Sequence, residues 1–212
     1  MTERTSHGDY IPGLGRHFLT PLYDVVHHVF GLQPVHQEMI DLAALRDGHR
    51  VLDIGCATAN LLRTIGRQRP GVALVGLDPD PKALARARRK ARRAGLDMRL
   101  DRGFAQELPY PDGSFDRVFS SLMLHHLEDT AKDQLLAEAR RVLRPDGLLI
   151  VADLVVDEHG HHGSRRMRAR LHDNVGDAVS RRVAAAGFTV EPTRTTTLGR
   201  RTAIGIELGR VS

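Results

Sequence analysis

Short runs of consecutive apolar residues alternate along this chain with stretches in which apolar residues recur every three or four positions. Runs of the first kind, bounded by Gly, Pro or Asp, are typical of strands buried on both faces, and the second pattern is typical of amphipathic helices. Strands are therefore predicted at residues 50–54, 73–78, 98–102, 116–120 and 148–152. Helices are predicted between them at residues 60–68, 81–94 and 130–143. This alternation predicts right-handed βαβ units and a parallel sheet, the α/β class.

The N-terminal part of the chain departs from the alternation. Residues 18–31 and 34–45 both carry helical patterns and precede the first strand. They predict an N-terminal helical cap over residues 1–48, followed by a core over residues 49–212 within a single domain.

The C-terminal part changes character as well. A helix is predicted at residues 175–186, followed by strands at residues 188–196 and 202–208 with only a short connection between them. Because two strands joined in this way must be antiparallel, we expect the sheet to end in a hairpin.

Composition narrows the class of protein. The chain has 212 residues, of which 41% are hydrophobic, a single cysteine, Cys56, and no apolar run near the roughly 20 residues that span a bilayer. One cysteine cannot form an intrachain disulfide and fits a reducing compartment, so a cytoplasmic location is expected. The net charge of +5 owes much to the predicted helix at 81–94, whose outer face is either a solvated surface or a site for nucleic acid or anionic lipid. Aromatic residues make up 4%, with no Trp, which disfavours a stacking platform for single-stranded nucleic acid.

The candidate chemistry lies at the end of the first predicted strand. Residues 51–60 read Val-Leu-Asp-Ile-Gly-Cys-Ala-Thr-Ala-Asn, a strand that turns at Gly55 into a helix whose N-terminal amides face the turn. Asp53 is placed either to order this loop or to accept hydrogen bonds from an ammonium group. Asp78, at the tip of the next strand, is placed for two ribose hydroxyls. A small-residue turn followed by an acid about 20 residues later indicates an adenosine-type cofactor.

With its other motifs, the chain resembles the class I S-adenosylmethionine-dependent methyltransferases, in particular the small-molecule branch that includes the ubiquinone and menaquinone C-methyltransferases. The motifs that carry the resemblance, besides residues 51–60, are residues 76–79 (Gly-Leu-Asp-Pro), 108–116, 124–127 (Leu-His-His-Leu) and 141–149. The resemblance implies a Rossmann-like sheet of seven strands, mostly parallel with an antiparallel last strand, and helices on both faces. It also implies S-adenosylmethionine as cofactor, S-adenosylhomocysteine as product and a small-molecule acceptor.

The resemblance further implies roles for matching positions. The methionine part of the cofactor would be surrounded by Asp53, Gly55, Cys56 and Ala57. The adenosine part would be held by Asp78, Pro79, Phe104 and Ala105. The floor near the sulfonium would be formed by Ser120 and Ser121.

The sequence departs from the family pattern in the cofactor region. Ala57 and Ala59 stand where the family usually has glycine, and each methyl group restricts the backbone. Phe104 stands where the family often has an Asp, and it cannot accept a hydrogen bond from adenine. A weakly binding or non-catalytic relative is therefore one alternative.

Histidines are candidates for the remaining chemistry. His125 and His126 follow the fourth strand, where a general base on the acceptor would lie, although they could equally cap or pack a short turn. Tyr23 and His27 share a face of the first cap helix and could touch the acceptor. His159, His161 and His162 lie near Asp157, but this spacing favours a solvated loop, and no metal site is predicted.

Other functions remain open at this stage. A lipid or RNA methyltransferase would use the basic helix. A dinucleotide-dependent oxidoreductase fits poorly. The turn has only one of the three glycines expected for dinucleotide binding, and the predicted C-terminal hairpin does not belong to that fold. The acceptor and the oligomeric state cannot be assigned from the sequence.

Overall fold

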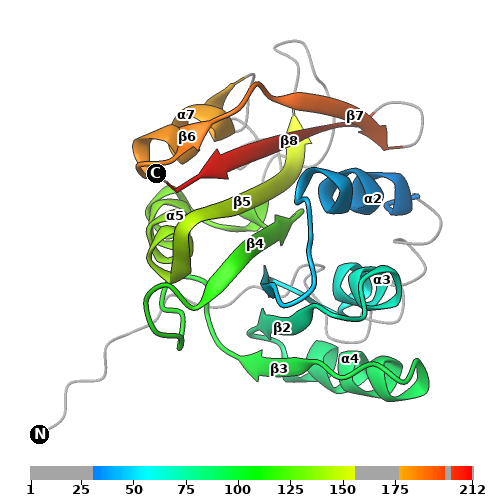
Figure 1. Cartoon of the computed structure of the whole chain (residues 1–212). Coiled ribbons are helices and arrows are strands. Elements are labelled where there is room, and N and C mark those ends of the chain that lie inside the picture. The colour runs from blue at the N-terminus through cyan, green and yellow to red at the C-terminus, as the bar shows by residue number, and fades with distance from the viewer. Residues whose placement is uncertain (1–30, 156–176, 199–201, 212) are drawn as a thin grey trace, which may run out of the picture.

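Five parallel strands form the larger part of a single sheet in the computed structural model of this chain, which describes residues 31–155, 177–198 and 202–211 (Figure 1). In spatial order they run β3-β2-β1-β4-β5, and every neighbouring pair is parallel. The strands are β1 (Arg50–Ile54), β2 (Ala73–Asp78), β3 (Arg99–Arg102), β4 (Phe115–Ser121) and β5 (Leu143–Val155). Strand order reverses at β1, because β2 lies on one side of it and β4 on the other. In doubly wound sheets the ligand crevice lies outside the carboxyl ends of the strands at such a point.

The sheet ends in antiparallel strands, as the sequence predicts. Strand β8 (Thr202–Arg210) pairs with β5, and both β6 (Thr189–Val190) and β7 (Arg194–Leu198) pair with β8. The predicted strand at residues 188–196 is thus two short strands, and the sheet has eight strands instead of seven. Pro192 lies in the gap between them, where its missing backbone N–H interrupts the ladder.

Helices cover both faces of the sheet (Figure 1). One face carries α2 (Gln33–Leu42), α3 (Asn60–Gln68) and α4 (Pro81–Arg93), which share a buried apolar cluster with alternate residues of the strands. The other face carries α5 (Asp129–Val142) and α7 (Ala178–Ala185), with a second cluster. These helices confirm the predicted layers.

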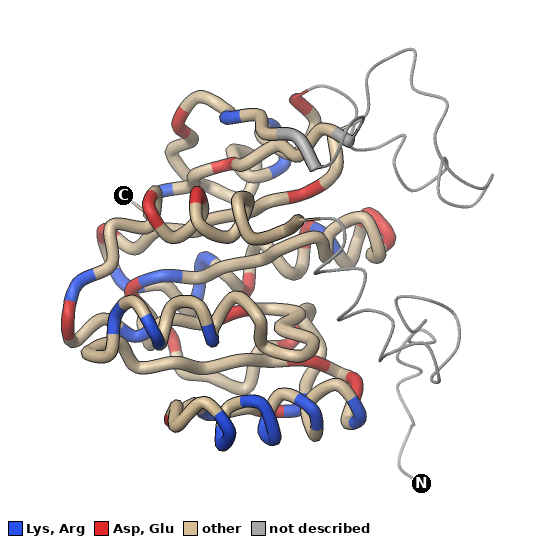
Figure 2. The backbone as a smooth tube through the Cα atoms, turned by 90° about the vertical axis from the view of Figure 1, so that its right-hand side faces the viewer, with Lys and Arg blue, Asp and Glu red and all other residues tan. Residues whose placement is uncertain are grey.

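The predicted basic helix is α4. Asp80 caps it by accepting a hydrogen bond from Lys82 N at 2.8 Å, and Pro81 occupies its first turn. Its inner face buries Leu84 and three alanines, while most of its other positions are Lys or Arg, which appear blue along the helix at the bottom of Figure 2. The amphipathic pattern therefore reflects packing against the sheet.

Two of the differences from the predicted boundaries have a clear physical cause. Helix α2 ends at Leu42 and not at Leu45, and Ala44 follows with a φ of 45°, which a helix cannot include. Strand β5 begins at Leu143, so residues 145–147, which the prediction leaves between the helix at 130–143 and the strand at 148–152, lie within it. Leu143 pairs with Phe115 and the register then shifts, so this part of β5 is an irregular extension of the ladder.

Several predictions lie outside the described residues, namely the helix at residues 18–31 with Tyr23 and His27, and the histidine-rich segment with His159, His161 and His162. Within the described part, no helix is long and apolar enough to cross a membrane.

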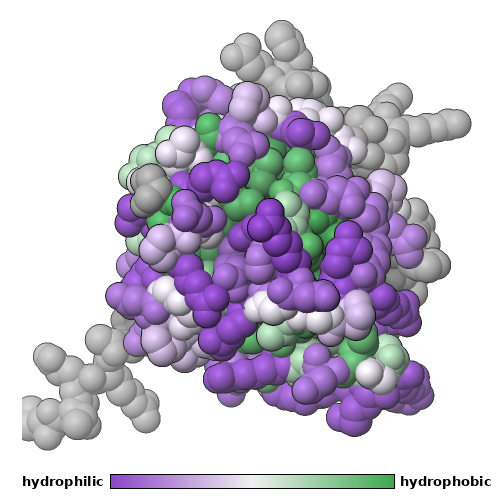
Figure 3. All heavy atoms as spheres, viewed as in Figure 1, coloured by the Kyte–Doolittle hydropathy of each residue, from purple (hydrophilic) through white to green (hydrophobic). Residues whose placement is uncertain are grey.

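On the face of the molecule shown in Figure 3, polar residues surround an apolar patch that lies over the upper strands of the sheet.

Candidate active site

The loop from Gly55 to Asn60 joins β1 to α3 in an unusual backbone conformation. Gly55, Ala57 and Ala59 have φ angles of 75°, 46° and 57°, in the left-handed region. At Gly55 a side chain is also excluded by space, because a Cβ atom would lie 2.6 Å from Met123 Cγ. The amides of Gly55 and Cys56 both donate to the carbonyl of Leu77, at 2.8 and 3.0 Å. The loop is therefore folded back against the end of β2.

Asp78, at the end of β2, orders this loop. Its Oδ2 accepts a hydrogen bond from Ala57 N at 2.9 Å, and its Oδ1 accepts one from Asp80 N at 2.8 Å. Burial raises the pKa of Asp78 to about 6, although these two backbone hydrogen bonds oppose the shift. The loop-ordering role that the sequence left open for Asp53 thus falls to Asp78. A carboxylate has about four acceptor positions, so ribose hydroxyls can still be accommodated.

Lys90 braces the loop from the neighbouring helix α4. Its Nζ donates to Thr58 Oγ1 at 2.9 Å and to Asn60 Oδ1 at 3.1 Å. Thr58 and Asn60 flank Ala59, so the ammonium group holds both sides of a left-handed residue. The sequence analysis did not single out any of these polar side chains.

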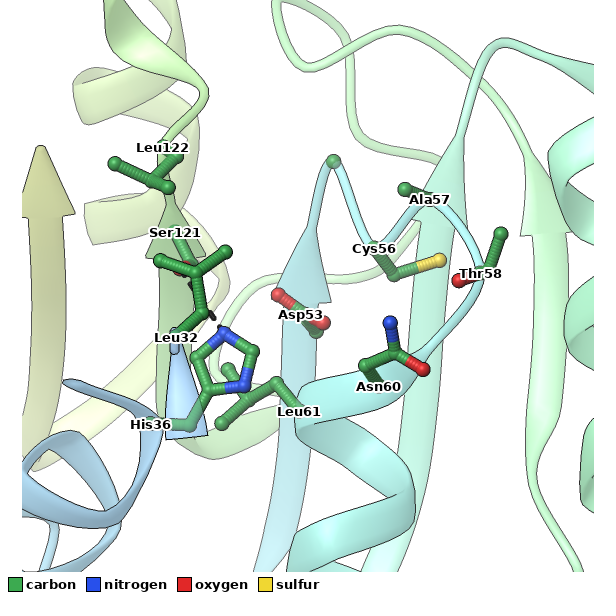
Figure 4. Close-up of a pocket in the computed structure, with 11 residues that line it drawn as sticks. Leu32, His36, Asp53, Cys56, Ala57, Thr58, Asn60, Leu61, Ser121 and Leu122 are labelled. Atoms are coloured by element: carbon green, nitrogen blue, oxygen red, sulfur yellow. Dashed lines mark hydrogen bonds between the residues drawn. The ribbon is translucent and has the colours of Figure 1, made fainter. Parts of the chain in front are cut away.

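A pocket opens where this loop meets the ends of β1 and β4 (Figure 4). Residues of several elements line it: Asp53 of β1, residues 55–58 of the loop, Asn60 and Leu61 of α3, Ser121 at the end of β4, Leu122 after it, Leu32 just before α2, and His36 of α2. It therefore lies at the carboxyl ends of the strands beside the reversal of strand order, where the fold predicts a ligand.

Asp53 is the buried acid of this pocket, with 3% of its surface exposed. Burial, and then the charge of Asp78, raise the pKa of Asp53 to about 8. Within the part of the chain that the structure describes, no hydrogen bond to its carboxyl group is found. A buried carboxyl group without a hydrogen-bond partner is costly on its own and would be stabilised by a cationic group in the pocket.

The structure brings together only part of the predicted site. Of the predicted residues, Asp53, Gly55, Cys56, Ala57 and Ser121 line the pocket, and Asp78 adjoins it through Ala57 N. Pro79, Phe104 and Ala105 do not line it. They follow β2 and β3 at the same edge of the sheet, where Gly103 N donates to Asp78 O at 3.4 Å. Ser120 is 1% exposed and does not line the pocket.

The histidines after β4 lie in the 3₁₀ turn η2 (Leu124–His126), where His125 is buried and His126 is partly exposed. His125 Nδ1 lies 2.7 Å from Asp153 Oδ1, and His125 N donates to Asp153 Oδ2 at 3.2 Å. The rings of His125 and His126 lie 4.1 Å apart, centre to centre, and neither residue lines the pocket. Asp153, on β5, is a polar partner that the sequence analysis missed.

The fold and this site define a Rossmann-like protein of the methyltransferase type, with a small-residue loop after β1 and an acid at the end of β2. The family described as a methyltransferase domain matches residues 51–147, which include both features. The chain belongs to the class I S-adenosylmethionine-dependent methyltransferases, which confirms the family that the sequence motifs indicated. The predicted cofactor is that of the family.

Individual relatives support this assignment. The chain is 34% identical over 148 residues to a demethylmenaquinone methyltransferase of Thermus thermophilus, covering 68% of this chain and 66% of the relative. Other curated relatives are matched over 41% and 57% of their lengths. Among solved structures, the [4+2]-cyclase SpnF has a TM-score of 0.71 at 21% identity, covering 84% of this chain and 80% of its own. A methyltransferase from Aquifex aeolicus has a TM-score of 0.66 at 20% identity, covering 88% and 93%. At these identities the two structures show the fold alone.

Proposed function

We propose that this chain transfers the methyl group of S-adenosylmethionine to a small-molecule acceptor. The observation that carries the proposal is the pocket beside the Gly55–Asn60 loop, in which the buried carboxyl of Asp53 has no hydrogen-bond partner among the described residues. The amino group of the cofactor's methionine part is a cation of the kind that such a carboxyl would stabilise. This chain's donor and acceptor groups therefore fit the cofactor.

The residues around the loop would hold the cofactor in two parts. The amino-acid end would lie against Asp53 and the loop, with Ser121 beside it, while Asp78 would accept hydrogen bonds from the ribose. The adenine would lie beyond Asp78, toward Pro79, Phe104 and Ala105. When bound, the cofactor supplies a methyl group that its sulfonium already activates. The protein's contribution is then to align the acceptor and to exclude water.

A base is needed when the acceptor is a hydroxyl or an ammonium group. His125 fits this role better than His126, because Asp153 accepts from its Nδ1–H and so leaves Nε2 as the acceptor nitrogen. His125 is buried, with 6% of its surface exposed. The acceptor would therefore have to reach it from the end of β4. A carbon acceptor that is already nucleophilic would not require this base.

The small-molecule class of the acceptor is supported by the relatives, since the Thermus thermophilus protein is named for demethylmenaquinone. Cys56 is a buried thiol, which suits the reducing cytoplasm in which we propose that the enzyme works.

The proposal is tested first by calorimetric titration of the full chain with S-adenosylhomocysteine, followed by reaction with methyl-labelled cofactor and panels of quinone, phenol and amine acceptors. We expect micromolar binding and transfer of label to at least one acceptor, with binding weakened in Asp53→Ala. Absence of binding at millimolar concentration would refute the proposal. Tight binding without transfer to any acceptor class would instead indicate a cofactor-binding relative that has a different activity.

A further inference from the structure

Helix α4 carries a row of cations on the side that faces away from the sheet (Figure 2). Lys82, Arg86, Arg89 and Arg93 follow one another at spacings of four, three and four positions, which places them along one line of an α-helix. Three of them are exposed, and Arg86 is half-buried. At about 1.5 Å per residue, this outer row is about 17 Å long.

The cations beside the outer row are directed back toward the protein. Arg88 donates to Leu100 O of β3 at 2.7 Å, and Lys90 donates to Thr58 Oγ1 of the cofactor loop at 2.9 Å. Both therefore hold α4 against its neighbours. Among the described residues, by contrast, no side chain of the outer row has a hydrogen bond or an ion pair.

Several arginines elsewhere in the described structure lie beside acids. Arg144 pairs with Asp116 at 2.9 Å, and Arg210 pairs with Glu191 at 3.4 Å. Helix α4 contains no Asp or Glu, so like charges stand three and four positions apart along the outer row. Such pairs destabilise a helix, and an anionic partner at this face would relieve their repulsion.

The composition of α4 indicates the kind of anion that fits. A helix that reads base edges combines cations with amide and hydroxyl side chains, and binding of single strands adds aromatic rings. Apart from Lys and Arg, α4 contains only Pro, Ala and Leu. Its apolar side is buried against the sheet, so the helix can contact a surface by charge alone. Anionic lipid headgroups form a surface of this kind, which a straight row of cations can contact over its whole length.

We propose that the outer row of α4 docks this protein on an anionic lipid surface. The long stems of Lys and Arg let the charges reach the headgroups while the helix stays packed on the sheet. Docking leaves the bond from Lys90 to the cofactor loop intact, because Lys90 lies beside the outer row and not in it. Binding to lipid is therefore independent of methyl transfer and can be measured without an acceptor.

Co-sedimentation of the full chain with vesicles tests the proposal. The vesicles consist of phosphatidylcholine alone or of phosphatidylcholine mixed with phosphatidylglycerol. The variant replaces Lys82, Arg89 and Arg93 together by Gln, which is uncharged and a good helix former. Each cation near an anionic surface contributes about fivefold, so the variant should bind mixed vesicles about a hundredfold more weakly than the wild type. Neither protein should bind phosphatidylcholine alone, and added salt should weaken the binding of the wild type.

The matched control replaces Arg181, Arg194 and Arg210 together by Gln. These exposed residues lie on α7, β7 and β8, toward the opposite edge of the sheet from β3. The control loses the same net charge and should bind mixed vesicles within about threefold of the wild type, since exposed charges beyond a Debye length are screened. If the triple variant of α4 does not fold, Arg89→Gln and Arg93→Gln singly should each lose about fivefold.

Three results would overturn the proposal: equal binding to both kinds of vesicle, a loss in the α4 variant no larger than in the control, or no binding of the wild type to mixed vesicles at low salt. Fluorescence anisotropy with double-stranded RNA covers the other polyanion. Tighter binding to that RNA than to mixed vesicles, lost in the α4 variant, would assign the outer row to nucleic acid and also overturn the proposal.

Discussion

Two alanines in the cofactor loop have the same unfavourable backbone conformation but different surroundings, and this difference predicts opposite responses to glycine. Ala57 has a φ of 46° and is half-buried at the pocket wall. Ala59 has a φ of 57° and is fully buried in the apolar cluster on the α2, α3 and α4 face. An L-residue in the left-handed region costs roughly 1–2 kcal/mol, which glycine does not incur.

The expected change in stability combines three terms. Replacing either alanine by glycine removes the strain of the left-handed conformation. Glycine also raises the conformational entropy of the unfolded chain, which lowers the free energy of unfolding by about 0.4–1 kcal/mol. For Ala57→Gly the net result is a stabilisation of about 0.5–1 kcal/mol. Ala59→Gly also exposes a cavity where a buried methyl group was, which costs about 0.8 kcal/mol more. Its net effect is therefore close to zero or slightly destabilising.

Urea unfolding followed by circular dichroism measures these differences, provided that the slope of the transition is unchanged. For a chain of this length, about 1 kcal/mol corresponds to a shift in Tm of roughly 2–4 °C. Ala85→Gly is the matched control, because Ala85 is exposed in the right-handed interior of α4 and should lose about 1 kcal/mol. A destabilised Ala57→Gly, or an Ala59→Gly more stable than Ala57→Gly, would contradict this account of the loop.

Other substitutions test the packing and the charges around the site. Asp53→Asn should flatten the pH dependence of the free energy of unfolding, measured by urea titration. The pKa of Asp53 in the folded state, about 8, lies above its value in the unfolded chain, so in the wild type the stability that this group contributes is present below about pH 4 and is lost as the pH rises toward 8. The loss amounts to at most about 1.4 kcal/mol per pH unit. Equal slopes between pH 5.5 and 8 would exclude Asp53 as the cause. Gly76→Ala should cost about 1–3 kcal/mol in thermal unfolding, because its Cβ would lie 2.8 Å from Cys56 Sγ, and Cys56→Ala should recover part of that loss. Arg141→Lys should lower the free energy of unfolding by about 1–2 kcal/mol. The guanidinium donates to Glu138 through two nitrogens, at 2.7 and 2.8 Å, and the single ammonium group of lysine cannot reproduce this two-point geometry. An unchanged Tm would refute this prediction.

The order of strands and helices could be predicted from the sequence because local signals agreed with the global fold. Helix α3 has the predicted bounds, Asn60–Gln68, and α5 differs from prediction by one residue at each end. Continuous apolar runs identified the central strands, which are buried on both faces. The extension of β5 was missed because Pro145 and Gly147 are turn residues by composition, and only pairing with β4 makes them part of a strand.

The site was predictable where it depends on the loop and less so where it depends on tertiary contacts. Asp53 and Gly55 follow from the strand–turn–helix pattern, Ala57 follows from the resemblance to the family, and the structure places all three at the pocket. That Asp78 orders the loop could not be predicted, since its bond to Ala57 N joins residues 21 positions apart. The brace from Lys90 spans 32 positions to Thr58 and had no sequence signal beyond a basic residue on a basic helix.

Two of the polar residues that the sequence analysis missed, His36 and Asp153, did carry a usable signal. His36 follows Leu32 by four positions and precedes Met39 and Ile40 by three and four, so it interrupts the apolar stripe of a helix. Asp153 interrupts the apolar run of β5 in the same way. Burying such a side chain costs free energy that a solvent-facing position would avoid, so a polar residue at an apolar position implies a partner. For Asp153 that partner is His125, within the protein. For His36, the hydroxyl of Ser121 lies 3.4 Å from Nε2, at the border of the pocket that also holds the buried acid Asp53.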